Sequence, residues 1–191
     1  MKGFVAGVVV TLLVLYFGFY LTVSQGWFPV GADNPPGHLE RKYANMAVDN
    51  YVEKHMPQGN NPMPADSANL MTGAMLYEKH CALCHGGGKD RTSPLVHKFS
   101  PPAPQILQRI PHDPDAHLWY VTKHGIRMTG MPSWDGVISD DDLWKVIAFV
   151  KNSNNLPPDV QAMWEQAAKG PSTTNEVSPQ AQPAQAAPKK K

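Results

Sequence analysis

The chain has 191 residues, and its 17 lysines and arginines nearly balance 16 aspartates and glutamates, giving a formal net charge of +1. A charge this close to zero, without a basic stripe or a glycine-rich phosphate loop, argues against nucleic acid as a partner. The length allows one domain with extensions, and the sequence shows no internal repeat.

A run without charge or proline occupies residues 4–23, after a short N-terminus at residues 1–3. Its length matches the apolar core of a bilayer and exceeds that of the apolar part of a typical signal peptide. It therefore predicts an uncleaved transmembrane signal-anchor, with a cleaved leader as the alternative. Trp27 and Phe28 follow, as interfacial anchors do. Lys2 favours a cytoplasmic N-terminus in a single-pass arrangement, with the rest of the chain in the periplasm.

Residues 24–65 are predicted to link the membrane helix to a domain. A Pro-Pro-Gly sequence ends the membrane helix, residues 38–55 have the periodicity of an amphipathic helix, and residues 56–65 form a proline-rich connector. The amphipathic helix either packs on the following domain or provides a docking surface for a membrane complex. Its apolar side holds Leu39, Tyr43, Met46, Ala47, Asn50 and Tyr51, and its charged side mostly holds Glu40, Arg41, Lys42, Asp49 and Glu53.

The most informative motif is Cys81-Ala82-Leu83-Cys84-His85, the C-x-x-C-H pattern of covalent c-type haem attachment. In this pattern two thiols bond the two vinyl groups of one haem, and His85 is placed to ligate the iron. On a helix Cys81 and Cys84 are one turn apart, and His85 lies four residues after Cys81. The alternatives are a thiol–disulfide pair, half of a zinc site completed by scattered histidines, and two buried thiols.

Capping residues mark the helices around this motif. Asp66 or Ser67 is predicted to cap a helix that runs toward Cys81, and the glycines at 86–88 end it. A proline-rich loop follows at residues 93–104.

Two further helices are expected after this loop. Asp113 is predicted to cap the first, with Pro114 at its first position, Leu118 and Val121 facing the core, and Gly125 after its end. The last helix has Ser139 as its cap, aspartates 140–142 in its first turn, and a buried face formed by Val146, Ile147 and Val150.

Met131 is the predicted second axial ligand, because methionine opposite histidine is common in cytochromes c. It lies between Gly130 and Pro132, which bend and stiffen its backbone. Three alternatives stay open. Met131 is core filler, Met128 takes its place, or His124 ligates to give a bis-histidine iron.

Together, Cys81–His85 and the Gly-Met-Pro-x-Trp loop at residues 130–134 resemble class I cytochrome c over about residues 66–156. Gly73 and Tyr77 match the glycine and aromatic positions of that family's first helix, and Phe149 matches the aromatic position of its last. In the family these helices cross, with the glycine permitting close approach. The stretch from Gly125 to Trp134 is also similar to a proteobacterial subset of membrane-anchored single-haem cytochromes.

The resemblance implies an all-α class I cytochrome c fold on an N-terminal transmembrane helix in the bacterial inner membrane. It implies one haem c, attached through Cys81 and Cys84 and ligated by His85 and Met131. The expected function is the transfer of single electrons between a membrane oxidoreductase and a periplasmic or membrane acceptor, without a small-molecule substrate. The alternative is a haem sensor or an enzyme subunit with an open or displaceable distal ligand.

Two residues around the haem are predicted to act indirectly. In many relatives a proline carbonyl accepts from the ligand histidine; Pro94 is the nearest match, although Pro101, Pro102 and Pro104 follow. Trp134 is a candidate indole donor to a haem propionate, with simple packing as the alternative. Residues 157–191 are expected to form an extension, with a short amphipathic piece at 159–169 and disorder from about 170.

Overall fold

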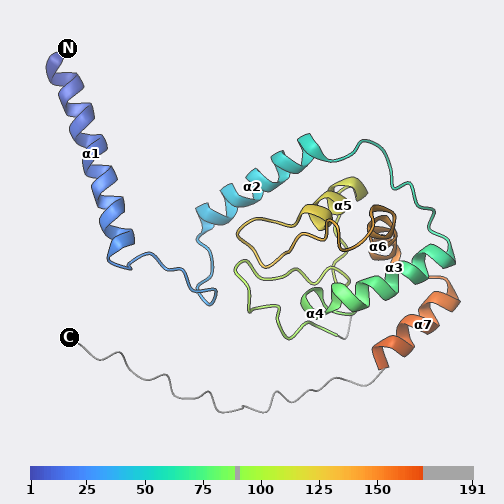
Figure 1. The fold of residues 1–191 in the computed structure, drawn as a ribbon. Helices are drawn as coiled ribbons and strands as arrows, with labels where there is room; N and C mark the ends of the chain where they lie inside the picture. The colour runs from blue at the N-terminus through green and yellow to red at the C-terminus, as the bar shows by residue number, and fades with distance from the viewer. Residues whose placement is uncertain (89–90, 170–191) are drawn as a thin grey trace, which may run out of the picture.

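The computed structural model describes residues 1–88 and 91–169, and this part of the chain is helical with no strand (Figure 1). The all-α prediction is therefore confirmed, whereas the disorder predicted from residue 170 lies outside the described residues. The helices are α1 (Lys2–Ser24), α2 (His38–His55), α3 (Ser67–His80), α4 (Ala82–His85), α5 (Asp115–His124), α6 (Asp140–Asn152) and α7 (Pro158–Lys169).

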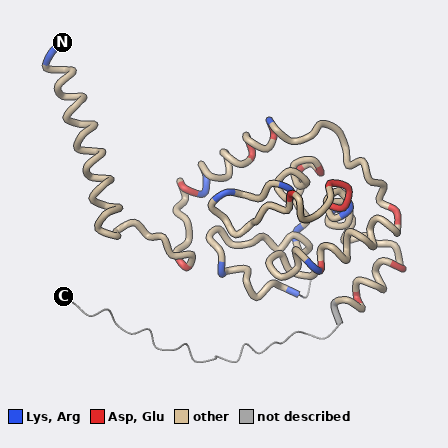
Figure 2. Tube along the Cα trace, in the orientation of Figure 1, with Lys and Arg blue, Asp and Glu red and all other residues tan. Residues whose placement is uncertain are grey.

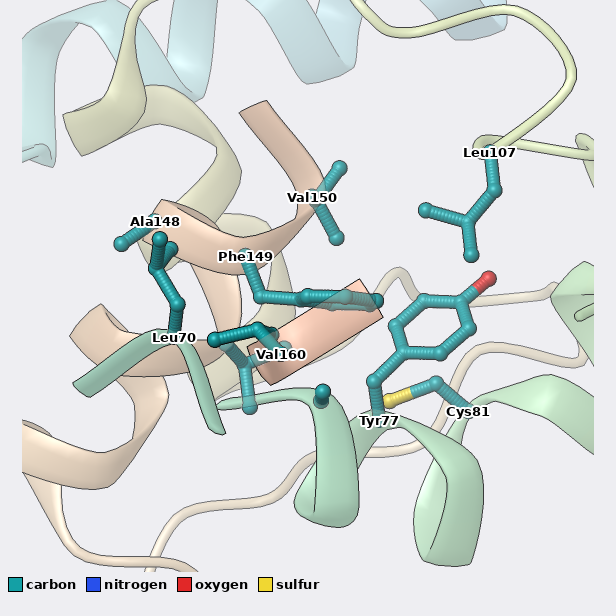
Figure 3. Packing of buried hydrophobic residues seen from close by; sticks show 10 residues of the cluster. Leu70, Tyr77, Cys81, Leu107, Ala148, Phe149, Val150 and Val160 are labelled. Carbon is teal, nitrogen blue, oxygen red and sulfur yellow. The ribbon is translucent and has the colours of Figure 1, made fainter. Parts of the chain in front are cut away.

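The crossing of α3 and α6 forms the centre of the domain. At Gly73 a Cβ atom would collide with the Lys145 carbonyl oxygen and lie 3.0 Å from the Phe149 Cβ, so only glycine allows this approach. Four residues later on α3, the Tyr77 ring lies 5.6 Å from the Phe149 ring (Figure 3). The helix crossing expected from the sequence is confirmed.

Side-chain caps fix where these two helices begin. The Asp66 carboxylate accepts a hydrogen bond from the Asn69 backbone N–H at 2.9 Å at the start of α3. The Ser139 hydroxyl accepts from the Asp142 N–H at 3.2 Å at the start of α6. Each cap satisfies a backbone donor that the helix leaves unpaired, and both predicted caps are confirmed.

Helix α7 belongs to the folded unit. Val160 on α7 has no exposed surface. The Trp164 ring lies 4.9 Å from Phe149 and 6.0 Å from Tyr77. The packed unit therefore extends beyond residue 156, where the sequence suggested that the domain ends. Its buried hydrophobic cluster consists of Leu70, Ala74, Tyr77, Cys81, Leu107, Val146, Ala148, Phe149, Val150 and Val160.

Helix α5 packs on the other side of α6, where the Trp119 and Trp144 rings stack at 5.1 Å. It begins at Asp115 with Pro114 as N-cap and without a side-chain cap, so the prediction that Asp113 caps it was wrong. The predicted inward residues Leu118 and Val121 are only half-buried. Ala116, His117 and Trp119 are buried instead, because the helix turns this side toward the tryptophan stack.

Helix α2 lies against α5 through its C-terminal end. Val52 is 4% exposed, and the Tyr51 ring lies 6.4 Å from the Tyr120 ring of α5. In the first half of α2, the side predicted to be apolar faces outward. Its residues Leu39, Tyr43 and Met46 are 65%, 58% and 47% exposed. The helix does pack on the domain, which was one of the two expected alternatives, and the contact is made by Val52 together with Tyr51, the last residue of the side singled out in the sequence.

Helix α1 stands apart from the domain in Figure 1, and none of its residues is buried. In Figure 2 it carries charge only at its N-terminal end, which is Lys2 in the sequence. By length and composition it is a helix that can cross a membrane. A signal sequence near an N-terminus has the same properties.

Candidate functional site

The C-x-x-C-H motif lies where α3 gives way to the single turn α4. Cys81 ends α3, its N–H donating to the Tyr77 carbonyl at 2.8 Å. The Cys81 carbonyl then accepts from the N–H groups of Cys84 and His85, at 3.1 and 2.9 Å. Gly86, with φ of 76°, stops the turn. Backbone hydrogen bonds thus hold both thiols and the imidazole at one corner of the domain.

Cys81 and Cys84 are not joined in a disulfide, and Cys81 is buried. Burial raises the pKa of Cys81 to about 12, with a smaller contribution from Cys84. A thiol–disulfide oxidoreductase needs a cysteine with a lowered pKa and an accessible sulfur. The environment of Cys81 is the opposite, and it disfavours the thiol–disulfide interpretation.

His85 is oriented by its hydrogen bond to the proline-rich loop. Its Nδ1–H donates to the Pro104 carbonyl oxygen at 2.8 Å, which leaves the Nε2 lone pair available to a metal. Burial lowers the pKa of His85, so the imidazole is neutral at neutral pH, as a metal ligand must be. The acceptor is Pro104, so the assignment to Pro94 was wrong. Pro94 lies exposed at the start of the loop.

Gln105 braces this loop against the motif, and sequence analysis missed it. Its side-chain amide N–H group donates to the carbonyls of Cys84 and Ala103, at 3.1 and 3.2 Å. Its side-chain oxygen accepts from the Ser93 N–H at 2.8 Å. Gln105 therefore joins both ends of the loop to the motif and holds the adjacent Pro104 carbonyl in place. Its only sequence signal is its position directly after a proline.

Met131 lies in a tight loop between α5 and α6. Its carbonyl accepts from the Ile126 N–H at 3.2 Å, and its own N–H donates to the Thr129 hydroxyl at 3.1 Å. Gly125, with φ of 69°, lets the loop close, because a Cβ there would lie 2.8 Å from the Met131 carbonyl oxygen. The Met131 side chain is half-buried. This is a fixed backbone carrying a partly shielded thioether.

The other two candidate ligands lie in less suitable places. Met128 is 88% exposed, with a positive φ of 62°. His124 is exposed at the end of α5, and its ring packs at 4.4 Å from Tyr120, toward the α2 side of the domain. These placements favour Met131 among the candidates.

Trp134 connects the methionine loop with the cysteine helix. Its ring meets the His80 ring edge-on, with centroids 5.0 Å apart, and His80 directly precedes Cys81. Trp134 also packs against the cluster that contains Trp119 and Trp144. These contacts support the packing role. The role as a propionate donor stays a prediction.

These residues fit a covalently bound haem. Two thiols one turn apart, an imidazole with a free Nε2 and a partly buried thioether are the groups that c-type haem uses. A zinc site needs about four ligands, and among residues 1–88 and 91–169 no group of three or more His, Cys, Asp or Glu side chains can hold a metal ion. The donor set therefore favours haem over zinc.

Comparison with known proteins agrees with this chemistry. A family model described as "Cytochrome C oxidase, cbb3-type, subunit III" matches residues 68–150. Cytochrome c6 from Tetradesmus obliquus is 31% identical over 84 residues, which cover 44% of this chain and 90% of that protein. The family match begins near the start of α3 and ends near the end of α6, so it contains both the C-x-x-C-H turn and the methionine loop.

Proposed function

This chain belongs to the class I c-type cytochromes, which are electron-transfer proteins and not enzymes, and we propose that it is a membrane-anchored carrier of single electrons. The observation that carries the proposal is the hydrogen bond from His85 to Pro104, because it leaves one imidazole nitrogen free at the corner that holds both thiols. Cys81 and Cys84 would hold one haem c through thioether bonds, with His85 and Met131 as axial ligands.

When bound, the haem supplies one-electron chemistry between its ferric and ferrous states. His85 and Met131 would hold the iron of this group, and their fixed positions would limit the rearrangement that accompanies electron transfer. The Pro104 carbonyl orients the His85 ring, and the hydrogen bonds of Thr129 and Ile126 fix the Met131 backbone. Thioether ligation would favour the reduced iron and raise the potential.

Helix α1 would anchor the carrier in the bacterial inner membrane, with the haem domain in the periplasm. Its length, the absence of charge after Lys2 and its unburied side chains support this arrangement. Anchoring restricts the search for a partner to the membrane surface and raises its effective concentration. The description of the matching family names an oxidase subunit. This supports a membrane oxidoreductase as the electron donor or acceptor.

Replacing the axial methionine tests the proposal. Met131→Ala is expected to abolish the near-infrared band of methionine-ligated ferric haem and to lower the reduction potential. Met128→Ala removes the exposed methionine of the same loop and is the matched control, expected to change neither property. If Met131→Ala keeps the band, or if the reduced wild-type protein binds CO rapidly, the axial assignment is wrong and the sensor or enzyme-subunit alternative gains support.

A further inference from the structure

Helix α2 exposes an apolar stripe on its first half. Leu39, Tyr43 and Met46 follow a spacing of four and three residues, which places them on one side of a helix. Their exposed fractions are 65%, 58% and 47%. Val52, which packs against the domain, is 4% exposed and lies on the opposite side by helical periodicity. The stripe therefore points away from the protein that α2 covers.

The chain itself keeps this stripe near the membrane segment. Helix α1 ends at Ser24 and α2 begins at His38, so the link between them is residues 25–37. At an extended length of about 3.4 Å per residue, this link spans at most about 45 Å. The link also exposes Trp27, Phe28 and Val30, at 74%, 54% and 88%. Aromatic side chains directly after an apolar helix are typical of the membrane interface.

We propose that the first half of α2 lies on the membrane surface, with Leu39, Tyr43 and Met46 in the headgroup region. This inference rests on the proposed anchoring by α1. A helix in this position buries apolar side chains at the boundary between headgroups and acyl chains, and tyrosine keeps its hydroxyl in water. Since α1 already holds the chain at the membrane, even a weak contact is populated through the high effective concentration.

The charges of α2 identify the kind of lipid surface it needs. Its basic side chains Arg41, Lys42 and Lys54 are matched in number by Glu40, Asp49 and Glu53. Glu40 is also engaged locally, accepting from the Gly37 N–H at 3.2 Å. Without an excess of positive charge, binding depends on the apolar stripe rather than on anionic headgroups. A zwitterionic phosphatidylcholine bilayer is therefore sufficient.

Membrane contact through α2 would orient the whole domain. The far end of α2 is packed on α5 through Val52 and through the Tyr51 and Tyr120 rings. Helix α5 in turn packs on α6 through the stacked Trp119 and Trp144 rings. If the first half of α2 is held on the bilayer, one face of the domain is therefore oriented toward the bilayer. An anchor on a free link would leave the orientation open.

Spin labelling of the full-length haem-loaded protein in phosphatidylcholine nanodiscs tests the contact. Nitroxides are attached to Tyr43→Cys, in the stripe, and to Asn45→Cys, an exposed position on the opposite side of the same half of α2. Collision rates are measured with oxygen, which concentrates in lipid, and with a water-soluble nickel complex. The ratio of oxygen to nickel accessibility is expected to be about threefold or more higher at position 43 than at position 45.

A third label at Leu12→Cys, within α1, separates this inference from the anchor that it requires. If position 12 is in lipid but position 43 is as accessible to nickel as position 45, the α2 contact is wrong and the anchor stands. If position 43 is shielded from both reagents, a protein surface covers the stripe and the lipid contact is equally wrong. If position 12 is itself in water, the proposed anchoring fails, and this inference fails with it.

Discussion

The domain formed by α3 to α7 buries most of its large hydrophobic residues at least in part, whereas the segment formed by α1 and α2 leaves most of its own exposed. In the domain, Tyr77 and Phe149 have no exposed surface and pack within the buried hydrophobic cluster (Figure 3). In α1 no residue is buried, and in α2 Val52 is the one buried residue. The domain supplies its own apolar environment, whereas the N-terminal segment presents apolar surface that something else has to cover.

This difference separates stability from location. Residues that determine whether the domain folds lie in the crossing of α3 and α6 and in the cover provided by α7. Under the proposed anchoring, the residues that determine where the protein works would lie in α1 and the first half of α2. The two sets are expected to respond independently to mutation, since the contacts of Val52 and Tyr51 with the domain lie at the C-terminal end of α2.

Removal of α1 is the change with the largest expected effect. If residues 1–24 are replaced by a cleavable leader, the protein should be lost entirely from the membrane fraction, while the melting temperature of the haem domain stays unchanged. Fractionation and thermal unfolding of the purified protein measure the two effects. A wild-type protein already found in the soluble fraction would instead support the cleaved-leader alternative.

Crowding the helix crossing should affect the domain alone. In Gly73→Val the new side chain meets the Lys145 backbone, which cannot move away without separating α3 from α6. We expect a loss of about 3 kcal/mol or more in the free energy of unfolding. Met75→Ala, at a 53% exposed position on the same helix, is the control. Equal stability of the two variants would show that the helices do not cross at Gly73.

Shortening Trp164 tests whether α7 is part of the domain. Its ring contacts Tyr77 and Phe149 and lies 5.6 Å from the Arg91 guanidinium. Because the side chain is only half-buried, Trp164→Ala should cost about 2 kcal/mol, less than a fully buried aromatic residue. The exposed Gln161→Ala on the same helix serves for comparison. If denaturant unfolding gives the same stability for both variants, α7 does not contribute to the stability of the domain.

The smallest expected effect on stability is the pH-dependent contribution of Asp142. The pKa of its carboxyl is lowered mainly by the hydrogen bond from Lys145, at 2.7 Å, and further by Ser139. The associated stability is present above the ordinary pKa of aspartate and is lost as the pH falls through the lowered value. Because the side chain is 35% exposed, Asp142→Asn should cost well under about 1 kcal/mol at pH 7.

The cost of Asp142→Asn should disappear in acid, where the wild-type carboxyl is protonated as well. Asp141→Asn, at an exposed neighbouring position, is the reference for the general effect of removing one charge from the first turn of α6. If both variants lose the same stability at every pH between 2 and 7, the contact with Lys145 contributes nothing of its own.

Features set by local chemistry were predictable from the sequence. The caps Asp66 and Ser139 act within three residues of their own position, and the Cys81–His85 turn has a fixed spacing. The glycine at 73 was expected from its family position, and its reason is steric. The starts of α3 and α6 and the cysteine corner therefore follow from short segments.

Features that depend on distant segments were not predictable. Which proline carbonyl meets His85 depends on the path of the whole loop, and Gln105 fixes that path through contacts at both ends. The periodicity of α2 shows that one side is apolar, but not that Tyr51 of this side packs on the domain while Leu39 and Tyr43 stay exposed. Val160 and Trp164 showed amphipathic spacing, yet only the position of α7 reveals that they complete the core.

The intact mass of the purified polypeptide, measured after denaturation and acid extraction of loose haem, tests the central claim most directly. After expression in a host with a c-type assembly system, the account predicts the mass of the chain plus one haem. It also predicts loss of that increment when Cys81 and Cys84 are both replaced by alanine. A wild-type polypeptide with no added haem mass would contradict the account.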